Sequence, residues 1–460
     1  MSGLSNQARR VSFYTVGCRL NQAETALLTD RFRAFGFEPV EFGDMTDVLV
    51  VNTCSVTEGA EADCRRVVRR VLRKSPHAFV AVTGCYAQTG ANALQAIDGI
   101  DLILGTQHKM QLPEYVSALP TYDKRERPDL LHTKKIDHEN FTVEGIGDYS
   151  TTRANLKIQD GCQFMCSFCL IPFARGRERS RQVDDAIREA SALAERGHRE
   201  LVLTGVNIGQ FQDADVDLIT LLQRLETIPG LDRIRISSIE PTTIPDQLLD
   251  YMATSHKLCR FLHVPLQSGD DRILSAMNRR YTVREYAAYI EKAARTIPDL
   301  CLGTDVMVGF PGESEQEFAN TRSLVSDLPF AYLHVFSYST RPGTAAVRLP
   351  HPVSPETIKA RSQELAKISQ RQRNVFYQKF VGRTVSVLFE TQNSKGLWTG
   401  LTDHYVKVGV PSGEDLKNDI RTVLVTGVTD GLALGSLNQS SEQNYEQSHT
   451  DLLSLTSQAL

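Results

Sequence analysis

Several features are scarce or missing in this chain of 460 residues, and each absence narrows the class of protein. No apolar run reaches the ~18 residues that a membrane-spanning helix requires, so we expect no membrane span. The first residues, MSGLSNQARR, lack the apolar stretch of a secretory signal peptide. The formal net charge is −4, which excludes a uniformly basic nucleic-acid binder but not a local basic surface.

Cysteine is present, but not in the pattern of a disulfide-stapled protein. The nine cysteines are an odd number spread over a long chain, and we therefore expect a reducing, cytoplasmic environment. A hydrophobic fraction of 41% and a charged fraction of 23% are typical of a globular protein. The length allows about three domains.

Two stretches of the chain alternate short apolar runs with helical segments, which predicts α/β domains with parallel strands. In the first stretch the strand candidates are residues 11–16, 47–52, 78–83 and 100–104. In the second they are residues 155–159, 200–205, 233–238, 261–266, 304–309 and 331–337. Six such units predict a partial TIM-like (β/α)6 barrel, whose sites lie at the C-terminal ends of the strands.

The C-terminal part of the chain has a different sequence pattern. Short strand candidates separated by turn residues predict a small OB-like β-barrel, and they are residues 384–390, 397–401, 404–410 and 421–428. The last residues are rich in Ser, Gln and Asn and predict a disordered tail. We place the domains at 9–120, 151–378 and 379–437, with a linker at 121–150 and the tail at 438–460.

The strongest local motif is the run QDGCQFMCSFC, which begins at Gln159. It carries Cys162, Cys166 and Cys169 with gaps of three and two residues and no fourth cysteine nearby. Thiolates are soft ligands for iron, and three of them would leave one iron of a [4Fe–4S] cluster open. A zinc site with a fourth ligand from elsewhere is the alternative.

A second group of cysteines emerges only through the predicted topology. Cys18, Cys54 and Cys85 each follow an apolar strand by one or two small or polar residues. If the strands are parallel, the three thiols meet at one edge of the sheet and could hold a second cluster with an open iron. Three buried free cysteines are the alternative. We expect Cys64, Cys259 and Cys301 to be inert packing residues.

Other residues near the predicted strand ends could bind a cofactor. Phe168 could pack on a purine ring or simply fill space under the loop. Glycines allow close backbone approach, and polar side chains could bind a ribose or an amino-acid group. On this basis we predict cofactor contacts from Gly205, Asn207, Ser237, Glu240, Gln267 and Gly309.

Two basic segments are candidate anion sites. On a helix, CRRVVRRVLRK (64–74) places Arg65, Arg66, Arg69, Arg70, Arg73 and Lys74 on one half and apolar residues on the other. Either this is a solvated face or it contacts a phosphate backbone. The segment ARGRERSR follows the cysteine loop, and we expect Arg175, Arg177, Arg179 and Arg181 to surround the mouth of the site and face an anionic substrate.

Taken together, these motifs resemble the radical S-adenosylmethionine (SAM) methylthiotransferases over about residues 11–435. GCRLNQAE (17–24), NTCSVTEGAEADCRR (52–66) and TGCYAQ (83–88) resemble the family's first cluster-binding domain. The Cys162 loop resembles its radical SAM motif, and the terminal β-barrel resembles a TRAM domain associated with RNA. GCRLNQAE and NTCSVT are most similar to the branch that modifies N6-threonylcarbamoyladenosine at position 37 of tRNA.

The resemblance implies an enzyme with two [4Fe–4S] clusters and SAM. The cluster on Cys162, Cys166 and Cys169 would cleave SAM to a 5′-deoxyadenosyl radical that takes a hydrogen from C2 of the adenine. The cluster on Cys18, Cys54 and Cys85 would present the methylated sulfur. No side-chain acid or base is implied. A one-electron donor such as a flavodoxin or ferredoxin would be a partner, and the substrate would be a tRNA anticodon stem-loop.

Two alternatives stay open at this stage. The same chemistry could act on isopentenyladenosine in tRNA or on an aspartate of a ribosomal protein. A zinc-stabilised, non-catalytic RNA-binding protein would also explain the cysteines, the basic helix and the terminal barrel.

Overall fold

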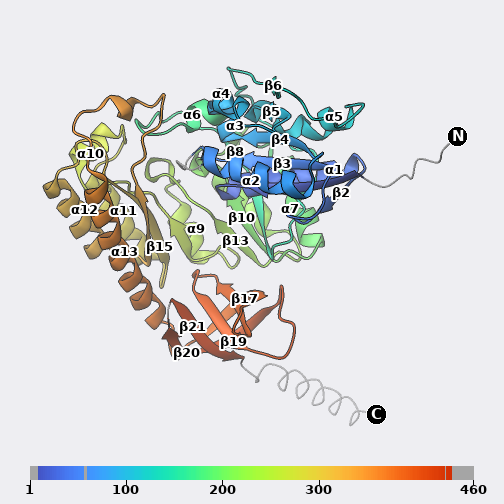
Figure 1. The fold of residues 1–460 in the computed structure, drawn as a ribbon. Helices are drawn as coiled ribbons and strands as arrows, with labels where there is room; N and C mark the ends of the chain where they lie inside the picture. Colours follow the sequence, from blue (N-terminus) through green and yellow to red (C-terminus); the bar gives the residue numbers. More distant parts are fainter. Residues whose placement is uncertain (1–8, 56–59, 430, 438–460) are drawn as a thin grey trace, which may run out of the picture. The chain divides into compact units, whose positions relative to one another are not determined.

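The computed structural model describes residues 9–55, 60–429 and 431–437. The chain forms two compact units, Met1–Ala366 and Lys367–Leu460 (Figure 1). The predicted tail, residues 438–460, lies outside the described residues. The finer domain boundaries drawn from the sequence stay predictions.

The larger unit begins with a six-stranded parallel sheet in the order β2-β1-β3-β4-β5-β6. Its strands are β1 (Arg9–Thr15), β2 (Phe37–Val40), β3 (Val48–Thr53), β4 (Phe79–Gly84), β5 (Leu102–Leu104) and β6 (Asp129–Leu131). Every residue of the three central strands β3, β4 and β5 is buried, as in parallel sheets covered on both faces. The four predicted strands are confirmed; β2 and β6 were not predicted, and β6 lies inside the predicted linker.

Helices cover both faces of this sheet (Figure 1). On one face, α2 (Ala60–Lys74) packs Val67, Val68 and Val71 against β3 and β4. On the other, α1 (Arg19–Ala34) and α5 (Leu112–Ser117) supply Phe32 and Val116. The remaining short helices are α3 (Cys85–Thr89), α4 (Ala91–Gln95) and the 3-10 turn η1 (Thr106–Gln111).

The second half of this unit contains six more parallel strands in two groups, β13-β10-β7 and β14-β15-β16. They are β7 (Arg153–Lys157), β10 (Glu200–Thr204), β13 (Arg233–Ile236), β14 (Phe261–His263), β15 (Cys301–Val308) and β16 (Tyr332–Ser337). A parallel bridge between Ile234 and Leu258 lies between the two groups. The six predicted βα units are therefore confirmed.

Helices alternate with these strands, as the (β/α) pattern requires. They are α6 (Ile171–Arg175), α7 (Val183–Glu195), α8 (Leu218–Glu226), α9 (Leu248–Thr254), α10 (Asp271–Ala276), α11 (Val283–Thr296), α12 (Glu315–Asp327) and α13 (Pro355–Gln378). Short elements complete the unit: β8 (Gln159–Asp160), β9 (Arg179–Ser180), β11 (Gln212–Asp213), β12 (Val216–Asp217), η2 (Ile208–Gln210), η3 (Pro241–Thr243) and η4 (Ala345–Arg348).

The smaller unit contains a closed five-stranded barrel in the order β17-β18-β19-β21-β20. The strands are β17 (Thr384–Gln392), β18 (Leu397–Thr402), β19 (Lys407–Pro411), β20 (Ile420–Thr429) and β21 (Leu432–Leu437). Leu388, Phe389 and Val408 are fully buried in its core. The predicted small barrel is confirmed, with β21 as an additional strand that closes it.

Two expectations about single features can be checked at once. Cys64, Cys259 and Cys301 are each at most 2% exposed, as expected of packing residues. Among the described residues, no helix is both long enough and apolar enough to span a bilayer.

Candidate active site

The structure brings Cys18, Cys54 and Cys85 to one edge of the first sheet. Cys18 precedes α1, Cys54 directly follows β3, and Cys85 is the first residue of α3 after β4. Since β1, β3 and β4 are parallel neighbours, their carboxyl ends coincide. Cys54 and Cys85 are buried and Cys18 is exposed. The juxtaposition that the topology predicted is present, and the role of these thiols as cluster ligands stays a prediction.

Tight backbone packing holds this edge in place. Gly84 has φ +101°, and a Cβ there would lie 2.3 Å from the carbonyl oxygen of Thr53, so only glycine fits before Cys85. The side chain of Asn21 donates hydrogen bonds to the carbonyl oxygens of Val16 (2.9 Å) and Thr53 (3.1 Å). These bonds connect the segments that precede Cys18 and Cys54.

The second triad lies in the loop that follows β7 and β8. Gly161 has φ +72°, and a Cβ there would lie 1.9 Å from the carbonyl oxygen of Arg177. The Cys162 amide donates to Gly176 O at 3.1 Å, which closes the loop that carries the three thiols. Arg279 Nη1 donates to Cys166 Sγ at 3.3 Å.

Burial raises the pKa of two of the thiols in this loop, those of Cys162 and Cys169. Burial is the main cause that raises the pKa of Cys162 to about 11 and that of Cys169 to about 12, and the charge of Cys166 adds to both shifts. A metal must displace these protons to bind. The Arg279 guanidinium beside Cys166 supplies a positive charge that suits the resulting thiolates.

The spacing of the thiols bears on which metal fits. Among the described residues, the only three candidate ligands whose donor atoms all lie within 4.8 Å of one another are His263, Asp305 and His334, so neither cysteine triad is that compact. Sulfur atoms bound to one tetrahedral zinc ion, at about 2.3 Å from it, lie about 3.8 Å apart. As they lie in this structure, the thiols of neither triad are therefore arranged around a single tetrahedral zinc ion.

One pocket of about 240 Å³ touches both cysteine regions. We call it the Cys169 pocket, and Cys169 lines it together with Ser55, the residue after Cys54. The other lining residues are Phe168, Leu170, Ile171, Gln267, Asp305, Met307, Phe336, Ser337, Tyr338, Ser339 and Arg341. The buried hydroxyls of Ser55 and Ser339 have no hydrogen-bond partner among the described residues. Because an unpaired buried hydroxyl is costly, the pocket, which is otherwise mostly apolar, is suited to an occupant that carries some polar groups.

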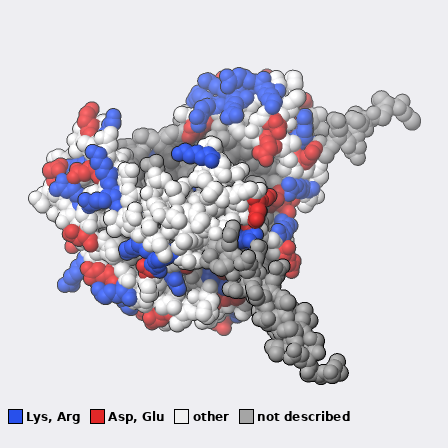
Figure 2. Space-filling view, turned by 90° about the horizontal axis from the view of Figure 1, so that it is seen from below, with Lys and Arg blue, Asp and Glu red and all other residues white. Residues whose placement is uncertain are grey.

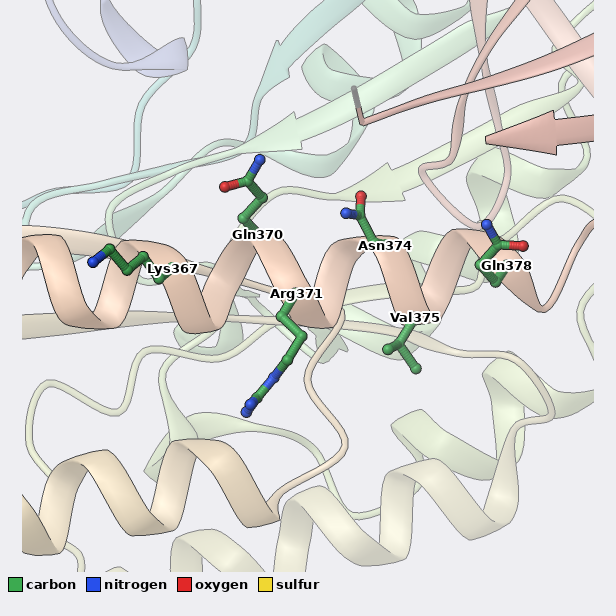
Figure 3. Close-up of a pocket in the computed structure, with 6 residues that line it drawn as sticks. All are labelled: Lys367, Gln370, Arg371, Asn374, Val375 and Gln378. Carbon is green, nitrogen blue, oxygen red and sulfur yellow. The ribbon is translucent and has the colours of Figure 1, made fainter. Parts of the chain in front are cut away.

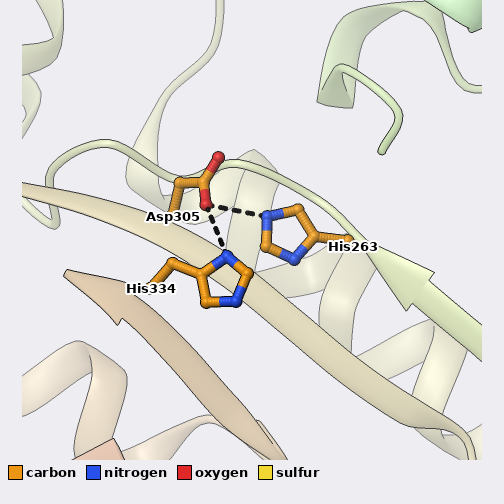
Figure 4. Close-up of side chains that lie close together, drawn as sticks. All are labelled: His263, Asp305 and His334. Atoms are coloured by element: carbon orange, nitrogen blue, oxygen red, sulfur yellow. Dashed lines mark hydrogen bonds and ion pairs between the residues drawn. The ribbon is translucent and has the colours of Figure 1, made fainter. Parts of the chain in front are cut away.

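A hydrogen-bonded group of three side chains holds Asp305 at the wall of this pocket (Figure 4). Asp305 Oδ1 accepts from His263 Nε2 at 2.9 Å and lies 3.4 Å from His334 Nδ1. His263 Nδ1 lies 2.9 Å from the Tyr332 hydroxyl. Although burial opposes ionisation, hydrogen bonds from the two histidines hold the pKa of Asp305 well below its usual range. Asp305 therefore presents a fixed, ionised carboxylate.

The predicted cofactor residues fall into two groups. Phe168 and Gln267 line the Cys169 pocket, and Phe168 also packs edge-on against Phe310 at 6.5 Å. Glu240 pairs with Arg279, the residue that contacts Cys166, and burial raises the pKa of Glu240. These three residues lie where a cofactor bound to the loop could reach them.

The other predicted residues make mainly structural contacts. The backbone N–H of Asn207 donates to Gln159 Oε1 at 2.8 Å, and Gly205, which has no side chain, leaves room for that same Gln159 side chain. The Ser237 amide donates to Leu203 O, and the Gly309 amide donates to Glu313 Oε2 at 2.6 Å. The structure does not bring Gly205, Asn207, Ser237 or Gly309 to the Cys169 pocket, and their cofactor role stays a prediction.

The expectation that four arginines surround the mouth of the site is wrong for two of them. Arg175 is 1% exposed, and Arg181 is fully buried and pairs with Asp185 at 2.6 Å and with Glu189. A guanidinium removed from water needs carboxylate partners, and these are supplied from within the chain. Sequence alone could not reveal the partners.

The part of α13 that belongs to the smaller unit, from Lys367 onward, borders a hollow (Figure 3). Its lining residues are Lys367, Gln370, Arg371, Asn374, Val375 and Gln378. No thiol or carboxylate lines it, so it lacks the chemistry of the Cys169 pocket.

Comparison with known proteins agrees with this arrangement. Residues 156–325 match the model of the Radical SAM superfamily, residues 10–105 that of uncharacterized protein family UPF0004, and residues 378–437 that of the TRAM domain. A solved structure of the radical SAM methyltransferase TsrM from Kitasatospora setae has a similar fold, with a TM-score of 0.55 and 15% identity over 74% of this chain and 77% of that one.

The fold and the Cys162 loop together define a radical SAM enzyme. Membership of this superfamily implies a [4Fe–4S] cluster and SAM, and the loop thiols beside Arg279 fit such a cluster. The threonylcarbamoyladenosine tRNA methylthiotransferases MtaB of Bacillus subtilis and Aquifex aeolicus are 35% and 37% identical, over 90% and 87% of this chain and 93% and 96% of their own lengths. A tRNA-2-methylthio-N(6)-dimethylallyladenosine synthase of Methylobacillus flagellatus is 33% identical over 94% of this chain and its own full length. The chain belongs to the radical SAM tRNA methylthiotransferase family.

Proposed function

We propose that this protein converts N6-threonylcarbamoyladenosine at position 37 of tRNA to its 2-methylthio derivative. The observation that carries the proposal is the Cys169 pocket, which is lined by a thiol of one triad and by the neighbour of a thiol of the other. Groups held by the two triads would therefore face one space. Insertion of a sulfur-containing group at an activated carbon needs this proximity.

Each triad would hold one [4Fe–4S] cluster, with Cys162, Cys166 and Cys169 for SAM and Cys18, Cys54 and Cys85 for the sulfur to be inserted. The bound clusters and SAM supply radical generation and sulfur transfer, and the chain supplies position and exclusion of water. Phe168 and Gln267 border the space for SAM, and Arg279 balances the thiolate charge at Cys166.

A few polar groups in the Cys169 pocket, whose lining is otherwise mostly apolar, support the threonylcarbamoyl substituent over a prenyl group. The unpartnered hydroxyls of Ser55 and Ser339 can donate hydrogen bonds to carbonyl and carboxylate oxygens, and the fixed Asp305 carboxylate can accept from hydroxyl and amide groups. An isopentenyl chain would leave the hydroxyls of Ser55 and Ser339 unpaired, which is unfavourable in a buried site. The greater identity to the two relatives named for threonylcarbamoyladenosine points the same way.

The exposed face of α2 supports RNA as the partner. Arg66, Arg69 and Arg73 line a hollow on this helix, and Arg69 and Arg73 make no ion pair with a described residue. Figure 2 shows Lys and Arg side chains gathered densely at the top of the view. Such a surface can neutralise backbone phosphates of the anticodon stem, while unpaired loop bases reach the site. The reducing compartment and a flavodoxin or ferredoxin as electron donor belong to the same proposal.

The test is nucleoside analysis by liquid chromatography and mass spectrometry of tRNA from cells that lack this protein. We expect the 2-methylthio-N6-threonylcarbamoyladenosine peak to vanish and its unthiolated precursor to accumulate. Expression of the chain should restore the peak, and expression of the Cys162→Ala variant should not. Loss of the isopentenyl counterpart instead would overturn the substrate assignment.

A further inference from the structure

Arg175 lies at the centre of a buried ionic network between the two cysteine regions. It is the last residue of α6, in the segment that follows Cys169, and it is 1% exposed. Its Nε donates to Cys85 Sγ at 3.1 Å, so a side chain next to the barrel triad contacts a thiol of the sheet triad.

Every N–H of the Arg175 guanidinium has an acceptor. Nη1 donates to Glu24 Oε1 at 2.9 Å and to Asp160 Oδ1 at 3.0 Å. Nη2 donates to Asn21 Oδ1 at 2.7 Å and to Glu24 Oε2 at 3.1 Å. A planar guanidinium with all its donors engaged cannot rotate, so the direction of the Nε–H toward the sulfur is fixed.

The cations of this network outnumber its carboxylates. Lys157 Nζ lies 2.7 Å from both Glu24 Oε1 and Asp160 Oδ2, and Lys109 Nζ lies 2.5 Å from Glu24 Oε2. Arg175, Lys109 and Lys157, which are at most 7% exposed, thus share two buried carboxylates, and Arg179 also pairs with one of them. Buried cations in excess of their anions are unfavourable, and an anionic cluster bound at Cys85 would place negative charge beside Arg175.

We infer that Arg175 is a positioning residue that fixes the orientation of the Cys85 sulfur as a cluster ligand and raises the reduction potential of the cluster on Cys18, Cys54 and Cys85. The inference rests on the proposed function, which places a cluster there. A hydrogen bond to a ligand sulfur and a nearby cation both stabilise the more negative, reduced state of a cluster. Glu24 lowers the reduction potential instead, because its negative carboxylate accepts a hydrogen bond from the same guanidinium and offsets the positive charge of Arg175.

The experiment uses the full chain with Cys162, Cys166 and Cys169 changed to alanine, so that only the sheet triad can load iron. Iron content is measured first, and then the reduction potential by electron paramagnetic resonance during a redox titration. Arg175→Lys keeps the charge but removes the Nε–H, and Glu24→Gln removes the opposing carboxylate. Arg179→Lys is the matched control, because Arg179 pairs with Asp160 at 3.1 Å and is not a donor to Cys85.

We expect Arg175→Lys to lower the equilibrium constant for reduction about tenfold, the effect of one charge-assisted hydrogen bond, which equals about 59 mV for one electron. Glu24→Gln should shift the potential in the opposite direction, and Arg179→Lys should leave it unchanged. Opposite shifts cannot arise from a general loss of packing. If Arg175→Lys does not load iron, the sign of the potential shift in Glu24→Gln still tests the inference: a higher potential supports it, and a lower or unchanged potential refutes it.

Two results would overturn the inference in distinguishable ways. Iron loading of all variants with an unchanged potential would refute the role of Arg175 and leave the proposed function intact. No iron in the parent triple-alanine chain would refute the second cluster itself, and with it both proposals.

Discussion

The basic face of α2 allows a quantitative prediction about tRNA binding. The change is the triple substitution Arg66→Gln, Arg69→Gln and Arg73→Gln. All three side chains are exposed on the helix, and glutamine preserves helix propensity, so the fold should be retained. The buried residues Val67 and Val71 on the opposite side are untouched.

The magnitude follows from counterion release. Each phosphate contact contributes about 0.7 to 0.9 to the slope of log affinity against log salt concentration, so the loss of three contacts lowers the slope by about 2 to 3. Between 50 and 200 mM salt, the fold loss of affinity should therefore be about 20- to 40-fold smaller in the variant than in the parent protein.

The assay is filter binding of the tRNA to the full-length protein over that range of salt concentration. The matched control carries Arg284→Gln, Lys292→Gln and Arg295→Gln on α11, where the side chains are also exposed. We expect the control to keep the parent slope. Equal slopes for the parent and the α2 variant would refute the role of this face in phosphate binding.

Three further predictions concern the site and its scaffold. Cys18→Ala should abolish thiolation while SAM cleavage survives, because the radical-generating triad is separate; the 5′-deoxyadenosine and thiolated nucleoside are quantified by mass spectrometry. Gly161→Ala should reduce the iron content from the expected eight atoms per chain to about four, because a Cβ clashes with Arg177 and displaces the Cys162 loop. Burial alone would raise the pKa of Glu200, but the neighbouring Arg235 guanidinium holds this pKa below its usual range. The stability from this pair is therefore present above the unfolded pKa of about 4.3 and is lost as the pH falls below it, as urea unfolding of iron-free protein would show.

Each of these predictions has a control or a contradicting outcome. Full thiolation by Cys18→Ala would show that the sheet triad holds no inserted sulfur. Gly230→Ala, at φ +76° with no close neighbour, should strain its turn without loss of iron, and an equal loss would refute a local effect of Gly161. Glu200→Gln should flatten the fall in unfolding free energy below about pH 5, and an unchanged profile would mean that other carboxyls dominate.

The sequence predicted the elements whose signals are local. Apolar runs such as residues 78–83 are buried along their whole length and identify β4, whereas the three-residue β6 lies in a polar segment and has no such signal. The approach of Cys18, Cys54 and Cys85 was predictable because parallel strands align their carboxyl ends. The predicted strand order therefore indicated the group, although the three cysteines are far apart in the sequence.

The rest depended on partners that are distant in the chain. Arg175 and Arg181 look like surface cations in the segment ARGRERSR, and only the approach of Glu24 and Glu189 explains their burial. His263, Asp305 and His334 are single polar residues in three different strands, and the register that pairs Asp305 with His334 creates the group. Such long-range pairings have no local signature.

The central claim is that the chain holds two separate clusters that serve one pocket. The most direct test measures iron and acid-labile sulfide per chain in protein purified without oxygen, beside the variant with Cys162, Cys166 and Cys169 changed to alanine. The account predicts about eight irons in the parent protein and about four in the variant. Zinc without iron, or complete loss of iron in the variant, would contradict it.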